Sequence, residues 1–242
     1  MEVLRHGGFD SLVILINRNQ LAPQIDLIDA AIAAGVPHIV PSCFGIDMDA
    51  VDPGLLAPIK EKVEMQKYVA AKAEEGKLSF TGVNTGLFFD WALNRGLLVN
   101  LKGGPTFLAD GGGVALSVTT LDHIGQAVAK AVLKRDQARN RLLYVHSAVV
   151  TQKKLLQYAK ELAPDREFPI VEVDTETGAR EAQEKIRSGA TGPAVFTPLM
   201  IRVTFGLGLG LFKKVDNEFL GLPMMSEEEV KALVASCVKR ES

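Results

Sequence analysis

The stretch LIDAAIAAGVPHIVPSCFG, residues 27–45, contains the end of a helix, a short strand and the loop that follows the strand. Its first apolar residues recur at helical spacing, and Gly35 stands where a helix commonly takes a left-handed cap. The next apolar triplet, 38–40, predicts a strand. Upstream, the unbroken apolar run at 11–16 is typical of a strand buried on both faces of a parallel sheet. Strand, helix and strand in this order predict one right-handed crossover.

Ligands of such a sheet bind beyond the carboxyl ends of its strands. Asn17 follows the first predicted strand directly, and the loop 42–45 follows the second. We therefore expect both segments on the ligand side of the sheet.

The alternation of helices and strands continues to about residue 161 and then changes. After the first unit, the pattern predicts helices at 59–75, 87–94, 121–134 and 151–161, and strands at 78–83, 115–118 and 141–145. Beyond these it predicts a strand at 170–173, a charged helix at 176–187 and a final helix at 227–238, opened by the capping box of Ser226 and Glu229. The fold class is therefore α/β: a Rossmann-like, doubly wound parallel sheet over 1–145, with a smaller α+β lobe over 146–242 that packs against its ligand edge.

Composition excludes several classes of function. The chain has 242 residues, is 47% hydrophobic and 23% charged, and carries a formal net charge of -2 without long single-sign blocks. This indicates a globular protein with a small-molecule ligand rather than a nucleic-acid partner. Neither the two cysteines nor the four histidines show the spacing of metal ligands, so we expect no metal site. The two cysteines, Cys43 and Cys237, lie far apart in the sequence, and we expect a reducing, cytoplasmic location.

The apolar segment 192–212 has about the length that a membrane span requires. Arg202 would lie near the bilayer centre, and two prolines interrupt the first half of the segment. We therefore expect a buried helix or a lid over an apolar pocket, and no membrane insertion.

Several short motifs occur in a fixed order along nearly the whole chain. They are QIDLIDAA at 24–31, AGV at 34–36, PSCFG at 41–45, LSFT at 78–81, NTGLF at 84–88, DHIG at 122–125 and NEFLGLP at 217–223. In order and spacing they resemble the NmrA-like and isoflavone-reductase-like branch of the atypical short-chain dehydrogenase/reductases, most closely its fungal members. The resemblance implies an oxidoreductase that uses NADP(H) as its cofactor.

Members of this branch normally begin with a strand, a GxxGxxG turn, a helix and two further strands before the point that corresponds to Leu4. The glycine turn brings the backbone close to the cofactor pyrophosphate. The glycines at 7–8 do not replace it, because no helix separates them from the strand at 11–16. We expect an N-terminally truncated sheet, from a truncated gene, a natural short paralogue or a pseudo-enzyme, with truncation favoured. The strand at 11–16 would then be an apolar edge, prone to aggregation or to pairing in a homo-oligomer.

The resemblance also implies a proton-transferring lysine on the helix after PSxFG. Lys62 is the best match and Lys60 the second. An amine that is desolvated beside a cationic ring has its pKa lowered, which suits it to proton exchange near neutral pH. The competing interpretation is a solvated surface lysine, since this helix carries several.

A second arrangement lies on the same helix. Tyr68 and Lys72 match the YxxxK pattern of conventional short-chain dehydrogenases, and Ser42 lies 26 residues before Tyr68. Spacing alone permits this alternative, but the local sequence matches the atypical branch better.

Five residues are expected to bind the cofactor by resemblance: Asn17, Ser42, Phe44, Asn84 and Phe88. The alternative for each is ordinary loop polarity or core packing. The leading hypothesis is an NAD(P)H-dependent reductase of a small, apolar organic substrate. The alternative is a non-catalytic NmrA-type dinucleotide sensor or regulator, or an inactive truncated paralogue.

Overall fold

The computed structural model describes residues 2–16 and 20–239. Its main sheet is parallel throughout and follows the order β1-β2-β3-β7. The strands are β1 (Leu12–Val13), β2 (His38–Val40), β3 (Ser79–Asn84) and β7 (Arg141–Tyr144). Every residue of β2 and β3 is buried, as expected of central strands with helices on both faces.

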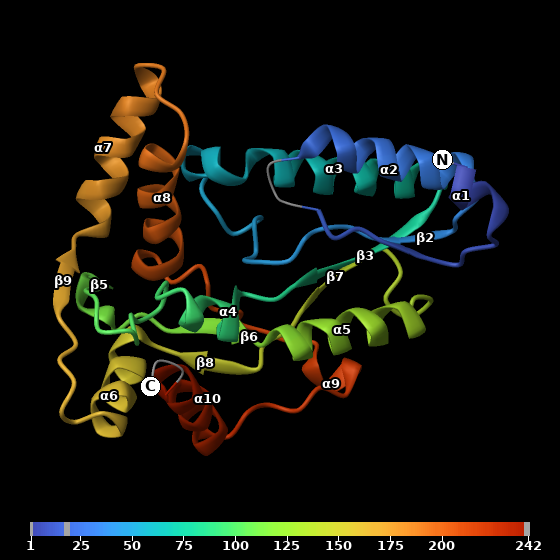
Figure 1. The fold of residues 1–242 in the computed structure, drawn as a ribbon. Coiled ribbons are helices and arrows are strands. Elements are labelled where there is room, and N and C mark those ends of the chain that lie inside the picture. The colour runs from blue at the N-terminus through green and yellow to red at the C-terminus, as the bar shows by residue number, and fades with distance from the viewer. Residues whose placement is uncertain (1, 17–19, 240–242) are drawn as a thin grey trace.

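Helices cover both faces of this sheet (Figure 1). On one face lie α2 (Leu21–Ala33) and α3 (Lys60–Glu74), which pack apolar residues against β2 and β3; on the other lies α5 (Leu121–Leu133). The predicted α/β class and the doubly wound, Rossmann-like arrangement are therefore confirmed. The left-handed backbone expected at Gly35 is also present, with φ of 74°.

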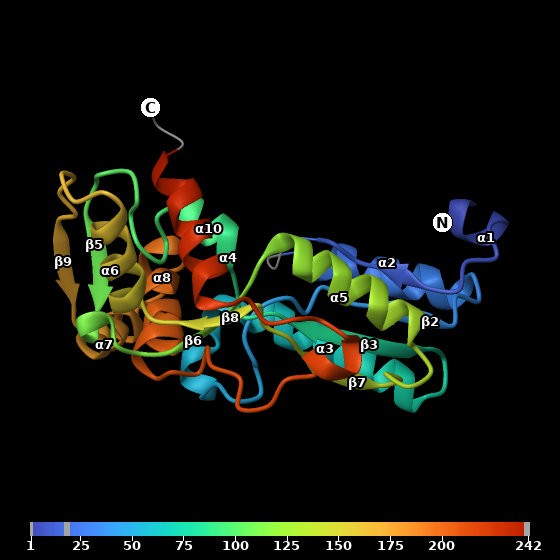
Figure 2. The ribbon, with the colours of Figure 1, turned by 90° about the horizontal axis from the view of Figure 1, so that it is seen from below.

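A second layer extends the fold beyond the carboxyl ends of the main strands. It contains a three-stranded sheet of order β4-β6-β8 and the parallel pair β5-β9. These strands are β4 (Leu87–Phe88), β5 (Thr106–Ala109), β6 (Leu116–Thr119), β8 (Ala148–Val150) and β9 (Ile170–Val173). The helices α4 (Phe89–Asn94), α6 (Gln152–Leu162) and α10 (Glu227–Lys239) share one apolar core with β6 and β8, and Figure 2 shows α6 and α10 near β8.

The remaining elements surround these layers. They are α1 (Glu2–His6), α7 (Thr175–Arg187), α8 (Pro193–Ile201), a π-helical turn (Arg202–Gly206), α9 (Asn217–Leu220) and the 3₁₀ turns Pro53–Leu55, Ala57–Ile59 and Asp110–Gly112. The expected capping box is formed: Ser226 Oγ accepts from Glu229 N at 3.2 Å, and Glu229 Oε2 accepts from Ser226 N at 2.7 Å. The division of the chain at residue 145 stays a prediction.

The apolar segment 192–212 begins with α8, whose buried residues pack with α7 and with the loop that follows β2. The expected buried helix is therefore present. Arg202 faces Asp110 at 3.7 Å and Glu176 at 3.4 Å. None of the helices in the described parts of the chain is long and apolar enough to span a bilayer.

Two expectations differ in detail from the structure. The first strand is shorter than the run 11–16, although Ile14 N still donates to Val40 O at 2.9 Å. The helix expected at 87–94 opens with the two strand residues of β4, because they pair with Val118 and Thr119 of β6. Tertiary pairing of this kind overrides local propensity. β1 lies at the edge of the main sheet, next to Leu15, which is 74% exposed.

The turn after β3 depends on Gly86. Its φ is +62°, and a Cβ at this position would lie 2.0 Å from Ser117 O. Gly35 has a similar φ of +74° but nothing within 4 Å of the equivalent point.

We predict that Gly86→Ala lowers the free energy of unfolding by about 3 kcal/mol or more, since it adds backbone strain and a collision. Gly35→Ala carries the backbone strain alone and should cost about 1 kcal/mol. Urea unfolding of both variants measures this difference. Equal losses would show that the close approach to Ser117 is unimportant.

His38 is a buried histidine at the start of β2, with 1% of its surface exposed. Ser79 Oγ donates to Pro37 O at 3.1 Å and lies 2.9 Å from His38 Nδ1, so Nδ1 carries the proton and donates to Ser79. The buried Nε2 has no partner among the described residues. Burial, and next the charges of Arg135 and Arg139, lower the pKa of His38 to about 4.

The native state therefore resists protonation of His38 where the unfolded state accepts it. Stability should be complete above the unfolded pKa of about 6.5 and should fall as the pH drops toward 4, with a loss of up to about 3 kcal/mol from this residue. His38→Asn keeps a donor for Ser79 and should flatten this pH dependence. Urea titrations between pH 7 and pH 4 test the prediction, and parallel curves for the two proteins would contradict it.

Candidate functional site

The loop after β2 is held at the carboxyl edge of the main sheet. Ser42 Oγ donates to Ile16 O at 2.9 Å, which joins the ends of β1 and β2. Gly45 O accepts from Thr85 N at 3.0 Å and from Gly86 N at 2.9 Å, which joins the same loop to the end of β3. The edge is therefore one hydrogen-bonded unit across three neighbouring strands.

Lys62 points into this unit from the first turn of α3. Its side chain is half-buried, and Nζ donates to Phe44 O and lies beside Gly45. Lys60, two residues earlier, differs in both respects: its side chain is 75% exposed and pairs with Glu64 at 3.6 Å. Of the two lysines considered from the sequence, Lys62 is the one whose amine lies at the carboxyl edge.

Asn84 holds the same loop from β3. The residue is 1% exposed. When its amide is oriented so that both the oxygen and the nitrogen face suitable partners, Nδ2 donates to Cys43 O and Ile46 O, each at 3.2 Å. The Asn84 amide nitrogen therefore bonds to backbone carbonyls of the protein itself. Burial raises the pKa of the Cys43 thiol to about 12, which outweighs the opposite effect of the nearby Lys62 ammonium. The Cys43 thiol is therefore protonated at neutral pH and is a poor nucleophile.

The predicted site residues fall into three groups. Ser42, Phe44, Lys62 and Asn84 are brought together at the carboxyl ends of β2 and β3. Phe88 lies half-buried on β4, opposite Thr119, in the second layer. Asn17 lies outside the described residues.

Tyr144 was missed from the sequence although it lies in the strand predicted at 141–145 and ends the observed β7. It is opposite Asn84 in the β3–β7 register, so the two side chains share one face of the sheet. Its ring meets Phe212 edge-on at 5.2 Å, and its hydroxyl contacts Asp47. Burial, followed by Asp47, raises the pKa of Tyr144 well above its usual value. The signal that could have found it is its place at the carboxyl end of a parallel strand.

A second missed group is the pair of Ser117 and His146. Phe212 N donates to Ser117 Oγ at 3.0 Å, and the same Oγ lies 2.9 Å from His146 Nδ1. The Ser117 hydroxyl can then donate its own proton to His146 Nδ1, so we assign the proton of the neutral His146 ring to Nε2. Burial lowers the pKa of His146 and keeps it neutral at pH 7.

The alternative pair Tyr68 and Lys72 has different surroundings. Tyr68 OH donates to Asp29 Oδ1 at 2.5 Å, and this hydrogen bond raises the pKa of Tyr68 to about 12. Lys72 pairs with Glu75 at 3.1 Å. A YxxxK tyrosine needs a lowered pKa, so these contacts favour Lys62 over this pair.

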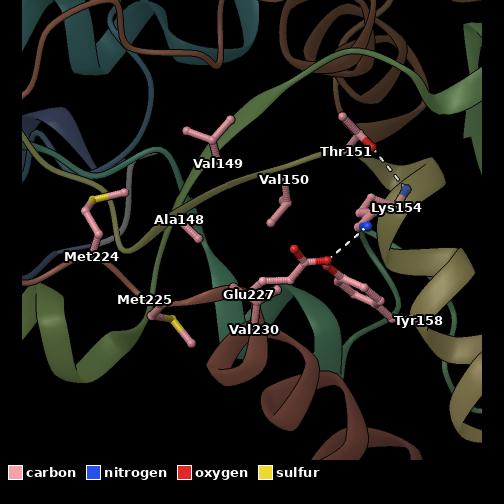
Figure 3. A pocket seen from close by; sticks show the side chains of 10 residues that line it. All are labelled: Ala148, Val149, Val150, Thr151, Lys154, Tyr158, Met224, Met225, Glu227 and Val230. Carbon is pink, nitrogen blue, oxygen red and sulfur yellow. Dashed lines mark hydrogen bonds and ion pairs between the residues drawn. The ribbon is translucent and has the colours of Figure 1, made fainter.

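Two pockets lie away from Lys62. One, of about 330 Å³, is formed by β8, α6 and α10 (Figure 3). The other, of about 630 Å³, is lined by residues between Asn94 and Gly104. Across residues 2–16 and 20–239, no group of three or more His, Cys, Asp and Glu side chains is placed to hold a metal ion.

Several known proteins similar to this chain are described as oxidoreductases or reductases. The model of the NmrA-like family matches residues 7–163. Oxidoreductase aprR of Aspergillus flavus is 28% identical over 234 residues, which cover 94% of this chain and 77% of the relative. Among solved structures, the leucoanthocyanidin reductase–NADPH complex of Vitis vinifera has a TM-score of 0.76 at 19% identity, covering 98% of this chain and 78% of that one. An isoflavone reductase has a TM-score of 0.74 at 16% identity, covering 97% and 76%.

Loss of the Asn84 amide should destabilise the edge directly. Asn84→Ala leaves two loop carbonyls without their buried donor, and we predict that it lowers the free energy of unfolding by about 2–4 kcal/mol. Asn94→Ala removes a comparable amide bond, from Nδ2 to Asp90 O at 2.8 Å, at a more accessible helix end, and should cost about 1 kcal/mol. Chemical unfolding of both variants measures the difference, and a smaller loss for Asn84→Ala would contradict this role.

Proposed function

The chain belongs to the NmrA-like family, and on this premise we propose that it is an NAD(P)H-dependent reductase of a small, apolar organic substrate. The observation that carries the proposal is the place of Lys62 Nζ, at the carboxyl edge of a doubly wound parallel sheet, where ligands of such sheets bind. The similarity to a fungal oxidoreductase and to solved structures of a leucoanthocyanidin reductase and an isoflavone reductase supports the same class of reaction.

NADP(H) is proposed as the cofactor because one similar structure is a complex with NADPH. The residues at the edge suit the nicotinamide end of such a molecule: Phe44 offers a half-buried aromatic ring, and Lys62 offers a cationic donor beside it. When bound, the nicotinamide supplies the hydride. Phe88 and Asn17 remain proposed contacts of the cofactor.

The roles of Ser42 and Asn84 follow from their bonds. Both side chains donate to backbone carbonyls, so we assign them to holding the loop that presents Phe44: Ser42 anchors the loop to the backbone after β1, and Asn84 holds it from β3. Pre-organised groups of this kind lower the cost of ordering a ligand.

Lys62 would exchange a proton with the substrate oxygen. The Phe44 carbonyl orients the amine at the edge, and half-burial limits competition from water. Tyr144 and Phe212 add aromatic surface on the same side as Asn84, which suits an apolar substrate. We place the protein in the cytosol, since Cys43 is a buried free thiol. Self-association through the β1 edge is part of the proposal.

The test compares Lys62→Met with Lys60→Met, two changes on one helix. We predict that Lys62→Met lowers NADPH-dependent turnover of a panel of apolar carbonyl and enol-ether compounds by about 10²–10⁴-fold, because proton transfer is lost. Lys60→Met should leave turnover within about twofold, since a solvated ion pair of this kind contributes little. Calorimetry of NADPH binding provides the control that both variants keep their cofactor site.

Three outcomes separate the alternatives. NADPH binding with Lys62-dependent turnover supports the reductase. NADPH binding without turnover of any compound in the panel favours a dinucleotide sensor. Turnover that survives Lys62→Met would refute Lys62 as the proton-transfer group.

A further inference from the structure

The pocket between β8, α6 and α10 combines an apolar wall with a compact polar end (Figure 3). Its volume of about 330 Å³ lies in the range of small-molecule sites. The apolar wall is formed by Ala148, Val149, Val150, Met224, Met225 and Val230. Val149 and Met224 are each 47% exposed, so apolar surface is open to a ligand here.

The polar end is a carboxylate held by two donors. Glu227 Oε1 accepts from Tyr158 OH at 2.6 Å and from Lys154 Nζ at 3.0 Å. Tyr158 is only 5% exposed, and its ring also lies under Lys154 Nζ at 4.9 Å. The hydrogen bond from Tyr158 is the largest of the effects that lower the pKa of Glu227, so this carboxylate is ionised at neutral pH.

The Glu227 carboxylate takes no part in the capping box of α10. The N-terminus of α10 is capped by Ser226 and Glu229, so the helix does not need the Glu227 carboxylate. Its side chain is 69% exposed and that of Lys154 is 45% exposed. Ion pairs at such exposure are worth little, so Glu227 can turn into solvent at small cost.

We propose that this pocket binds a small aliphatic carboxylate, whose head group replaces the Glu227 carboxylate between Lys154 and Tyr158. The exchange keeps one negative charge opposite Lys154 and keeps an acceptor for the buried Tyr158 hydroxyl, so no polar group is left unsatisfied. The hydrocarbon part of the ligand then covers Val149 and Met224. Glu227 is a built-in competitor for this ligand.

The site is separate from the proposed reductase site. Lys62 lies on α3, which covers the opposite side of the molecule from α6 and α10 (Figure 1). No residue that lines the pocket is among those that hold the loop after β2. Binding here is therefore measurable without a reductase substrate.

The chain offers a matched control within the same cluster. Lys231 Nζ lies 5.6 Å from the centre of the Tyr158 ring and pairs with Glu161 Oε2 at 2.5 Å. This pair resembles that of Lys154 and Glu227 in chemistry and exposure, but neither residue lines the pocket.

The test is calorimetry of octanoate binding to the full chain and to four variants. Lys154→Met should weaken binding by about tenfold or more, because a charged hydrogen bond to the carboxylate is lost. Glu227→Gln should tighten binding several-fold, because the competing carboxylate is removed. Lys231→Met and Glu161→Gln should each stay within about twofold of the unchanged protein. Thermal unfolding of each variant verifies that it is folded.

Octanol serves as the second probe, since it has the same chain and no carboxylate. The proposal expects octanol to bind more weakly than octanoate and to be insensitive to Lys154→Met. Equal binding of both probes would show a merely apolar cavity and would overturn it. Equal losses for Lys154→Met and Lys231→Met would overturn it as well, as would the absence of octanoate binding to Glu227→Gln.

Discussion

The hydrogen bonds that join β3 to the loop after β2 are the constraint on which the candidate site depends. Thr85 N and Gly86 N donate to Gly45 O, and the Asn84 amide fills the positions beside it. Without these donors, the carbonyls of Cys43, Gly45 and Ile46 would lose these hydrogen bonds, at a cost of about 1–3 kcal/mol for each one left unsatisfied. The loop is therefore ordered by the sheet itself, and the Phe44 carbonyl is placed as a partner for Lys62.

The same constraint links fold to chemistry. A parallel sheet gathers the ends of its strands at one edge, so side chains far apart in sequence meet there. Lys62 arrives from α3, Asn84 from β3 and Tyr144 from β7. The C-terminal part of the chain closes the arrangement, since Phe212 contacts both Tyr144 and Ser117. The proposed reductase activity rests on the family, and this geometry is the reason for proposing Lys62 as its proton-transfer group.

Most of the elements were predictable because their signals are local. Helical periodicity predicted α3 and α5 with ends close to those observed, and the capping box marked the start of α10. The apolar run at 11–16 predicted β1, although the observed strand is shorter. The two-residue strand β4 exists through pairing with β6, which no local pattern reports.

The candidate site also contains features that the sequence predicted and features that depend on contacts distant in sequence. The motif PSCFG placed Ser42 and Phe44, and order along the chain selected Lys62. The Asn84 amide donates to loop carbonyls rather than to a ligand because of the conformation of the loop. No local sequence pattern predicts that conformation. Tyr144 contacts Asp47 and Phe212, and His146 contacts Ser117. These partners are distant in sequence, so no local pattern predicts the contacts.

The central claim is that Lys62 lies where the cofactor binds, and lysine acylation followed by mass spectrometry tests it most directly. Acylation rates of Lys62 and Lys60 are measured in the same sample, with and without NADPH. The account predicts that NADPH slows acylation of Lys62 and leaves that of the exposed Lys60 unchanged. NADPH binding that leaves both rates unchanged, or slows both equally, would contradict it.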